Sequence, residues 1–188
     1  MVSNSLERIE NAKKISEHIP ELVIYEGDNN DVFNKYIRCF NIDNCFDGVV
    51  VLEDDILLCK GFYNKIMEVI CKHRETVISF FEKPNSKKEL KTSFNSGYDF
   101  MFNQCNYYPR WACDLFKDKQ TIDRFKDWYI NSGKKWIAPI DIYIANVLGE
   151  NKIKYLMKVP FLVQHLPMKS MLGNRSTKRQ TKYFIDDI

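Results

Sequence analysis

Three consecutive acidic residues, Glu53, Asp54 and Asp55, are the part of this sequence whose residue type and spacing most plainly suggest chemistry. They follow Gly48–Leu52, an apolar run rich in β-branched residues that predicts a buried strand. Ligands of open α/β sheets bind beyond the carboxyl ends of the strands, and neighbouring carboxylates repel one another unless a cation lies between them. The triplet therefore indicates a site for Mg²⁺ or Mn²⁺ that bridges to a phosphorylated substrate. The alternative is that these acids cap the helix expected after them.

Two other residues could take part in the same chemistry. His165 follows the apolar residues 159–163, so we expect it to emerge at a sheet edge. A lone histidine is more often structural than a metal ligand, but the acidic triplet gives this one a partner for metal binding. Asp141 begins a strongly apolar helical pattern. It is either an ordinary acid at a helix N-terminus or a carboxylate available as a general base.

Two longer segments allow both a functional and a plain interpretation. Residues 169–182 hold five basic residues and no acid, so Lys169 and Arg175 can close over a diphosphate as a lid. The same segment is equally well described as a disordered basic tail. Residues 98–111 are rich in aromatic side chains, which either stack on a sugar or nucleobase or belong to the core.

The elements that position these residues alternate between helical and strand-like patterns. Helical spacing predicts helices over residues 6–18, 31–40, 62–70, 122–130 and 140–148. Short apolar runs predict strands over residues 22–25, 48–52, 76–81 and 98–102, with one or two more within 153–163. Residues 83–91 predict a polar surface loop. The alternation predicts one α/β domain over residues 1–188, with a mostly parallel central sheet flanked by helices and a basic tail or lid over 169–188.

Composition narrows the class of protein. With 45% hydrophobic residues in 188, the chain can build one core, which excludes a disordered or fibrous protein. A net charge of +3 is too small for a protein whose main ligand is a nucleic-acid backbone. No apolar stretch reaches the ~20 residues of a membrane span, and the polar N-terminus is unlike a signal peptide. Six cysteines without C-x-x-C spacing predict free thiols in a reducing compartment, so we expect a cytoplasmic protein. A small chain rich in Lys, Ile and Asn is typical of a viral or bacterial protein.

Three motifs together resemble those of GT-A-fold glycosyltransferases. Residues 49–57 read Val-Val-Val-Leu-Glu-Asp-Asp-Ile-Leu, residues 159–165 read Val-Pro-Phe-Leu-Val-Gln-His, and residues 1–8 read Met-Val-Ser-Asn-Ser-Leu-Glu-Arg. The likeness covers most of the chain in the order typical of the family. The chain differs in having Ile140 before Asp141, where the family more often has an acidic pair.

The resemblance implies a role for each candidate residue. In this family the acidic motif holds a metal ion and the ribose of a nucleotide sugar, which implies Asp55 as a metal ligand and Glu53 and Asp54 as ribose-side residues. The late histidine completes the metal site, which implies His165 as the second ligand. Mn²⁺ is expected over Mg²⁺ because it tolerates imidazole better.

The opening segment of the family meets the nucleotide base, which implies that Ser3 and Arg8 contact the donor. The position of Asp141 in the chain order matches that of the base in inverting enzymes of this kind. Lys169 and Arg175 would then cover the donor diphosphate.

The expected function is therefore a metal-dependent hexosyltransferase that moves a sugar from a nucleoside-diphosphate donor, with a UDP-sugar as the first choice. The expected acceptor is a glycan or another hydroxyl compound, because the net charge is modest, and a modified DNA base is the alternative acceptor. A metal-dependent nuclease or phosphohydrolase is a second interpretation, since such enzymes also cluster acids with a histidine. A non-catalytic nucleotide-sugar-binding module is a third.

Overall fold

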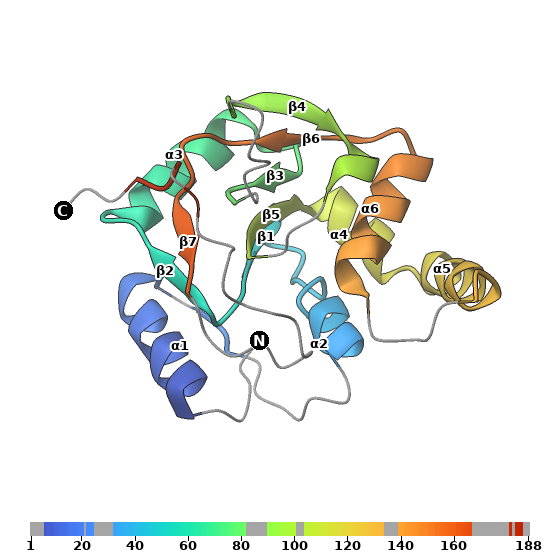
Figure 1. The fold of residues 1–188 in the computed structure, drawn as a ribbon, viewed down its shortest axis with the longest axis horizontal. Coiled ribbons are helices and arrows are strands. Elements are labelled where there is room, and N and C mark those ends of the chain that lie inside the picture. The colour runs from blue at the N-terminus through green and yellow to red at the C-terminus, as the bar shows by residue number, and fades with distance from the viewer. Residues whose placement is uncertain are drawn as a thin grey trace.

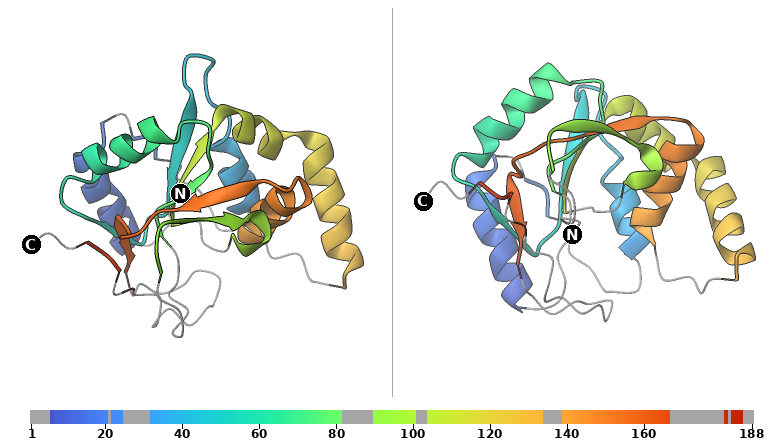
Figure 2. Two further views of the ribbon diagram at one scale, coloured as in Figure 1. Left: turned by 90° about the horizontal axis from the view of Figure 1, so that it is seen from above. Right: turned by 45° about the horizontal axis from the view of Figure 1, so that its top comes forward.

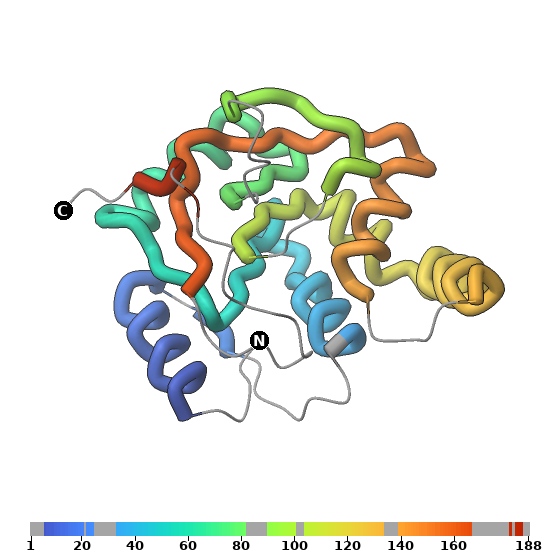
Figure 3. The backbone as a smooth tube through the Cα atoms, in the orientation of Figure 1, coloured from blue at the N-terminus to red at the C-terminus, as the bar shows by residue number. Residues whose placement is uncertain are grey.

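The computed structural model describes residues 6–20, 22–24, 32–81, 90–100, 104–133, 139–166, 181 and 183–185. The helices in this part of the chain are α1 (Leu6–His18), α2 (Val32–Arg38), α3 (Phe62–Lys72), α4 (Arg110–Lys117), α5 (Lys119–Asn131) and α6 (Ile140–Glu150), with a 3₁₀ turn η2 at Gly97–Asp99. The strands are β1 (Gly48–Leu52), β2 (Ile56–Leu58), β3 (Ile78–Ser79), β4 (Ser93–Ser96), β5 (Cys105–Pro109), β6 (Lys154–Met157) and β7 (Val163–His165). Figure 1 shows their arrangement, and Figure 3 traces the same path as a tube.

The main sheet has five strands in the order β1-β5-β3-β6-β4. Its pairs are antiparallel except for β3 and β6, which run parallel. The fold is thus α/β as expected, but the prediction of a mostly parallel sheet is wrong, and β1 lies at the edge of the sheet. The apolar run Gly48–Leu52 packs against apolar residues on both faces, although only Val51 is buried and the other four residues are half-buried. It carried no information on the direction of its neighbour, β5, which lies in the aromatic-rich segment.

Two hydrophobic clusters hold the helices on the sheet. One cluster joins β1 and β5 to α2, α4, α5 and α6 through fully buried rings that include Phe40, Tyr108, Phe116 and Tyr143. The other joins β2, β3 and β5 to α1 and α3 through residues such as Ile15, Ile56 and Ile66. Strand β1 contributes to both, because Val51 belongs to the first cluster while Val50 and Leu52 pack against the second. Figures 1 and 2 show the corresponding division, with α1 and α3 to one side of the strands and the other helices opposite.

A separate two-stranded sheet carries the late histidine to the acidic triplet. Strands β2 and β7 pair antiparallel, and their register sets Ile56 opposite His165. The backbone N–H of Leu166 extends the pairing by donating to the carbonyl of Asp55 at 2.8 Å. Backbone hydrogen bonds thereby fix the segment that carries His165 beside the segment that carries Asp55.

Most of the expected helices are confirmed, and the errors concentrate in the strands. Helices are present where the sequence predicts them, although the segments forming α4, β2, β4 and β5 were missed. Residues 98–99 belong to a 3₁₀ turn rather than a strand, whereas residues 101–102 lie outside the described residues. Residues 22–24 lie outside any strand, and only two residues of 76–81 form one. The polar loop of residues 83–91 falls outside the described residues except at 90 and 91, which belong to no helix or strand.

The structure also tests the expectations of free thiols and of no membrane-spanning helix. All six cysteines are free thiols: Cys59, Cys105 and Cys113 are buried, and the other three are half-buried or exposed. Within the described residues, no helix combines the length and the apolar character needed to cross a bilayer.

Candidate functional site

The acidic triplet forms the turn between β1 and β2. β1 ends at Leu52, the Glu53 amide donates to the carbonyl of Gln104 at 3.0 Å, and β2 begins at Ile56. No helix begins at this turn. The next helix, α3, starts after Gly61, which has a left-handed backbone (φ 66°) and offers no side-chain cap. The capping alternative is therefore wrong, and the three carboxylates must be balanced by other partners.

Asp55 is the most constrained of the three acids. Its side chain is 10% exposed, and its Oδ2 accepts a hydrogen bond from Arg8 Nη2 at 2.9 Å and lies 3.4 Å from His165 Nε2. Its Oδ1 is buried and has no hydrogen-bond partner among the described residues. Burial raises the pKa of Asp55. Hydrogen bonding and charge from His165, and then from Arg8, lower it by more, so the pKa lies below its usual 3.8. Asp55 is therefore a carboxylate at neutral pH with one unpaired, buried oxygen.

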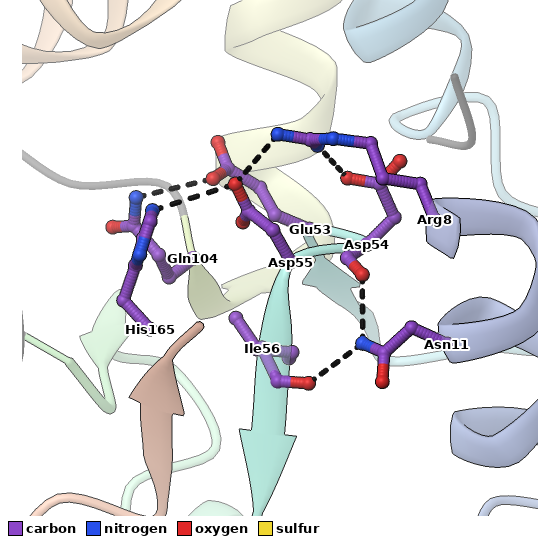
Figure 4. A network of polar contacts seen from close by, with 8 residues as sticks. All are labelled: Arg8, Asn11, Glu53, Asp54, Asp55, Ile56, Gln104 and His165. Carbon is purple, nitrogen blue, oxygen red and sulfur yellow. Dashed lines mark hydrogen bonds and ion pairs between the residues drawn. The ribbon is translucent and has the colours of Figure 1, made fainter. Parts of the chain in front are cut away.

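Arg8 and Asn11 attach helix α1 to the acidic turn. The Arg8 guanidinium bridges two carboxylates, with Nη1 on Asp54 Oδ1 and Nη2 on Asp55 Oδ2. One helical turn later, the Asn11 amide donates to the carbonyls of Asp54 and Ile56 at 2.8 and 2.9 Å. Figure 4 shows both side chains approaching the turn from the same helix. Arg8 belongs to α1, which spans Leu6–His18 as the helical spacing of residues 6–18 predicts.

Glu53 points toward the same region but has a different neighbour. Its Oε2 accepts a hydrogen bond from Gln104 Nε2 at 3.1 Å, while the Gln104 Oε1 is buried without a hydrogen-bond partner among the described residues. Figure 4 shows Glu53, Asp55, Gln104 and His165 converging from three separate segments. Gln104 was missed by sequence reasoning. The available signal was its place immediately before a buried strand.

A buried pair of tyrosines is affected by the charge of the acidic turn on one side and by the charge of Asp141 on the other. The hydroxyls of Tyr36 and Tyr108 are 3.3 Å apart, and burial is the main cause that raises the pKa of both. The charge of Glu53 adds to this effect on Tyr36, and the charge of Asp141 adds to it on Tyr108. Asp141 itself lies in the first turn of α6, half-buried. Asp141 thus acts on Tyr108 through its charge, whereas Asp55 contacts Arg8 and His165.

A cavity of about 570 Å³ lies against β1 and reaches Glu53 and Asp54. Its volume is within the range of small-molecule sites, about 300–1,000 Å³. The walls are mostly apolar and come from α1, residues 22–24, residues 41–46 and β1, including Ile15, Leu22, Ile42 and Val49. A ligand with an apolar or aromatic body and a charged end fits this combination of walls and rim.

The other candidate residues are the donor contacts expected in the two terminal segments and the aromatic-rich segment. Ser3, Lys169 and Arg175 lie outside the described residues. In the aromatic-rich segment, Phe100, Tyr107 and Tyr108 are buried in the two clusters, as the core interpretation predicts for them. Tyr98, in contrast, is 60% exposed.

The donor set around Asp55 fits a divalent cation that keeps several non-protein ligands. Asp55 Oδ1 offers a buried, unpaired carboxylate oxygen, and His165 Nε2 lies beside the same carboxylate. Within the described part of the chain, no group of three His, Cys, Asp or Glu side chains is placed to hold a metal. A single carboxylate nevertheless agrees with the usual habit of Mg²⁺-type sites, which take one or two carboxylates and fill the remaining positions with water and substrate phosphates. The imidazole of His165 suits a softer cation such as Mn²⁺ better.

Comparison with known proteins adds no relative: no protein-family model matches the chain, and no curated protein matches it significantly.

Proposed function

We propose that the protein is a metal-dependent glycosyltransferase that uses a nucleoside-diphosphate sugar, with a UDP-sugar as the donor. One observation carries the proposal. His165 follows Asp55 by about 110 residues in the sequence, yet its Nε2 lies 3.4 Å from Asp55 Oδ2. The other oxygen of this carboxylate, Oδ1, is buried and has no hydrogen-bond partner among the described residues. An acid at the end of a strand and a late histidine are the two ligands implied by the resemblance to GT-A-fold enzymes.

The residues of the turn divide the work of donor binding. Asp55 and His165 would hold the divalent cation, Mn²⁺ in preference to Mg²⁺. Bound there, the cation would act as a Lewis acid and neutralise the charge that develops on the leaving diphosphate. Glu53 and Asp54 lie at the rim of the cavity, where they can accept hydrogen bonds from a ribose while the base occupies the apolar interior.

Asp141 is the proposed general base of an inverting transfer. A base must remove the proton of the acceptor hydroxyl as its oxygen attacks the anomeric carbon. Asp141 is half-buried at the N-terminal end of α6, and its charge acts on Tyr108. The hydroxyl of Tyr108 lies 3.3 Å from that of Tyr36, on which the charge of Glu53 acts. In Figure 1 this end of α6 lies on the same lower side of the molecule as the turn after β1. A glycan hydroxyl is the proposed acceptor, in keeping with the net charge of +3.

The alternative of a two-metal nuclease has less support. Such sites need acids from several segments, placed so that two ions lie about 4 Å apart. The described residues contain no group of three acidic, histidine or cysteine ligands. The acids of the turn also come from a single segment.

Calorimetric titration of UDP in the presence of Mn²⁺ tests the proposal directly. The wild type should bind UDP in a Mn²⁺-dependent manner, and Asp55→Asn should lose at least about tenfold in affinity. The matched control is Asp114→Asn, which removes an exposed carboxylate on α4 that is paired with Lys117. UDP affinity that is equal in the wild type and Asp55→Asn would show that the proposed site is wrong.

Turnover assays separate the three classes of function. A transferase should release UDP from a UDP-hexose, faster when a glycan acceptor is present. A nuclease or phosphohydrolase should cleave DNA or phosphate esters without any nucleotide sugar. A binding module should bind UDP with Mn²⁺ and release nothing.

A further inference from the structure

The acidic turn already has a cation of its own, supplied by the chain. Arg8 has an exposed side-chain fraction of only 11%, and its two terminal nitrogens contact different carboxylates, one of Asp54 and one of Asp55. Planar guanidinium groups suit this forked geometry, and a lysine ammonium does not reproduce it. Arg8 therefore lies where it balances charge between two adjacent acids.

Helix α1 holds Arg8 in this place. Asn11, on the same face one turn later, bonds two carbonyls on either side of Asp55 at 2.8 and 2.9 Å. Ala12 and Ile15 of α1 are buried, so the helix is also held by apolar packing. Polar contacts and apolar packing of α1 thus hold the guanidinium beside the turn.

The charges of the turn set up a competition. Arg8 places one positive charge on the carboxylates of Asp54 and Asp55, and Gln104 donates to Glu53 through a neutral amide. A buried carboxylate without a balancing cation is strongly unfavourable. A divalent cation at Asp55 Oδ1 would sit on the same carboxylate whose Oδ2 accepts from Arg8, so the two positive charges repel each other.

We propose that Arg8 is a built-in counter-cation of the acidic turn: it keeps the site folded when no divalent cation is bound, and its charge weakens the binding of that cation. The inference rests on the proposed function for the presence of the cation. It makes Arg8 a residue that sets cation affinity, and not only a contact of the nucleotide.

The test measures the binding of Mn²⁺ alone, without nucleotide, by electron paramagnetic resonance of the free ion. Arg8→Gln should bind Mn²⁺ about tenfold more tightly than the wild type, the effect of one removed neighbouring charge. Arg8→Lys keeps the charge and should stay within about threefold of the wild type. Arg124→Gln, which removes an exposed arginine on α5, is the control and should not change the affinity.

Thermal unfolding supplies a second readout that does not depend on activity. In EDTA, Arg8→Gln should unfold at a lower temperature than the wild type, and saturating Mn²⁺ should raise its melting temperature more than that of the wild type. An Arg8→Gln protein that stays unfolded at saturating Mn²⁺ contradicts the inference, because the ion should be able to replace the guanidinium.

The outcomes distinguish the inference from the proposed function. If the wild type binds Mn²⁺ but Arg8→Gln binds it equally or more weakly, the counter-cation role is wrong and the metal site stands. If neither protein binds Mn²⁺ at millimolar concentration, the proposed function fails, and the competition fails with it.

Discussion

Replacing Asp55 with asparagine should cost stability as well as cation binding, and the structure allows the cost to be worked out. The asparagine keeps an oxygen for Arg8 but loses the negative charge that pairs with both Arg8 and His165. Breaking a buried ion pair costs 3–5 kcal/mol when one charge is left without a partner. Arg8 keeps Asp54 here, so we expect a smaller loss of about 2–3 kcal/mol in the free energy of unfolding at pH 7 in EDTA, in the range of a charged hydrogen bond.

The pH dependence of this loss follows from the lowered pKa of Asp55. Burial opposes the charged form of Asp55, but His165 and Arg8 outweigh this effect and lower its pKa in the folded state to below 3.8. The unfolded chain takes up a proton on this carboxylate around pH 3.8, before the folded state does. The contribution of Asp55 is therefore fully present well above pH 3.8 and is lost as the pH falls through the folded-state pKa. The difference between wild type and Asp55→Asn should shrink correspondingly on acidification.

Urea denaturation followed by tryptophan fluorescence measures this difference, repeated between pH 7 and pH 2.5. Asp114→Asn serves as the control, because its exposed pair with Lys117 should contribute almost nothing at either pH. The reasoning is refuted if Asp55→Asn is as stable as the wild type at pH 7. It is also refuted if the gap between the two proteins stays constant down to the lowest pH.

Three further predictions concern other parts of the chain. Asp141→Asn should lower kcat by about 10²–10⁴ and leave the affinity for the UDP-sugar nearly unchanged, and a near-normal kcat would remove both the base and the preference for inversion. Gly97→Ala should destabilise by about 1–3 kcal/mol in urea denaturation, since its Cβ would stand 2.4 Å from Leu148 Cβ and 2.5 Å from the Leu148 backbone carbon; an unchanged midpoint speaks against this contact. Iodoacetamide should label exposed Cys45 within minutes in the folded protein, while Cys105, whose thiol pKa is raised well above normal by burial, should react only in denaturant; equal labelling rates by mass spectrometry would contradict the burial.

The sequence predicted the strand before the site to the residue but not the sheet that contains it. Gly48–Leu52 is the whole of β1, because an apolar β-branched run is a local signal of burial. Its partner β5 lies in a segment whose aromatic residues suit either core or binding site. The direction of pairing depends on the path of the chain between the two strands, and no local pattern encodes that path.

In the site, too, local sequence patterns identify candidate residues, whereas the contacts between distant segments do not follow from such patterns. The acids and His165 were found because unusual residue types follow apolar runs, and the structure brings Asp55 and His165 together. Their meeting depends on the β2–β7 pairing, and β2 was not predicted as a strand. Gln104 and Asn11 were missed because a single amide in a polar or helical segment has no spacing to distinguish it.

The three acids of the turn differ in the partners that the fold supplies, and this difference decides what each can do. Glu53 accepts a hydrogen bond from the neutral amide of Gln104 and lines the cavity. Asp54 is bonded by Arg8 through its side chain and by Asn11 through its carbonyl, so its main effect is to hold α1 against the turn. Asp55 alone combines a lowered pKa, a neighbouring imidazole and a buried oxygen without a hydrogen-bond partner among the described residues. A cation entering this turn would therefore gain most at Asp55, although Glu53, Asp54 and Asp55 are almost equivalent when read as a sequence.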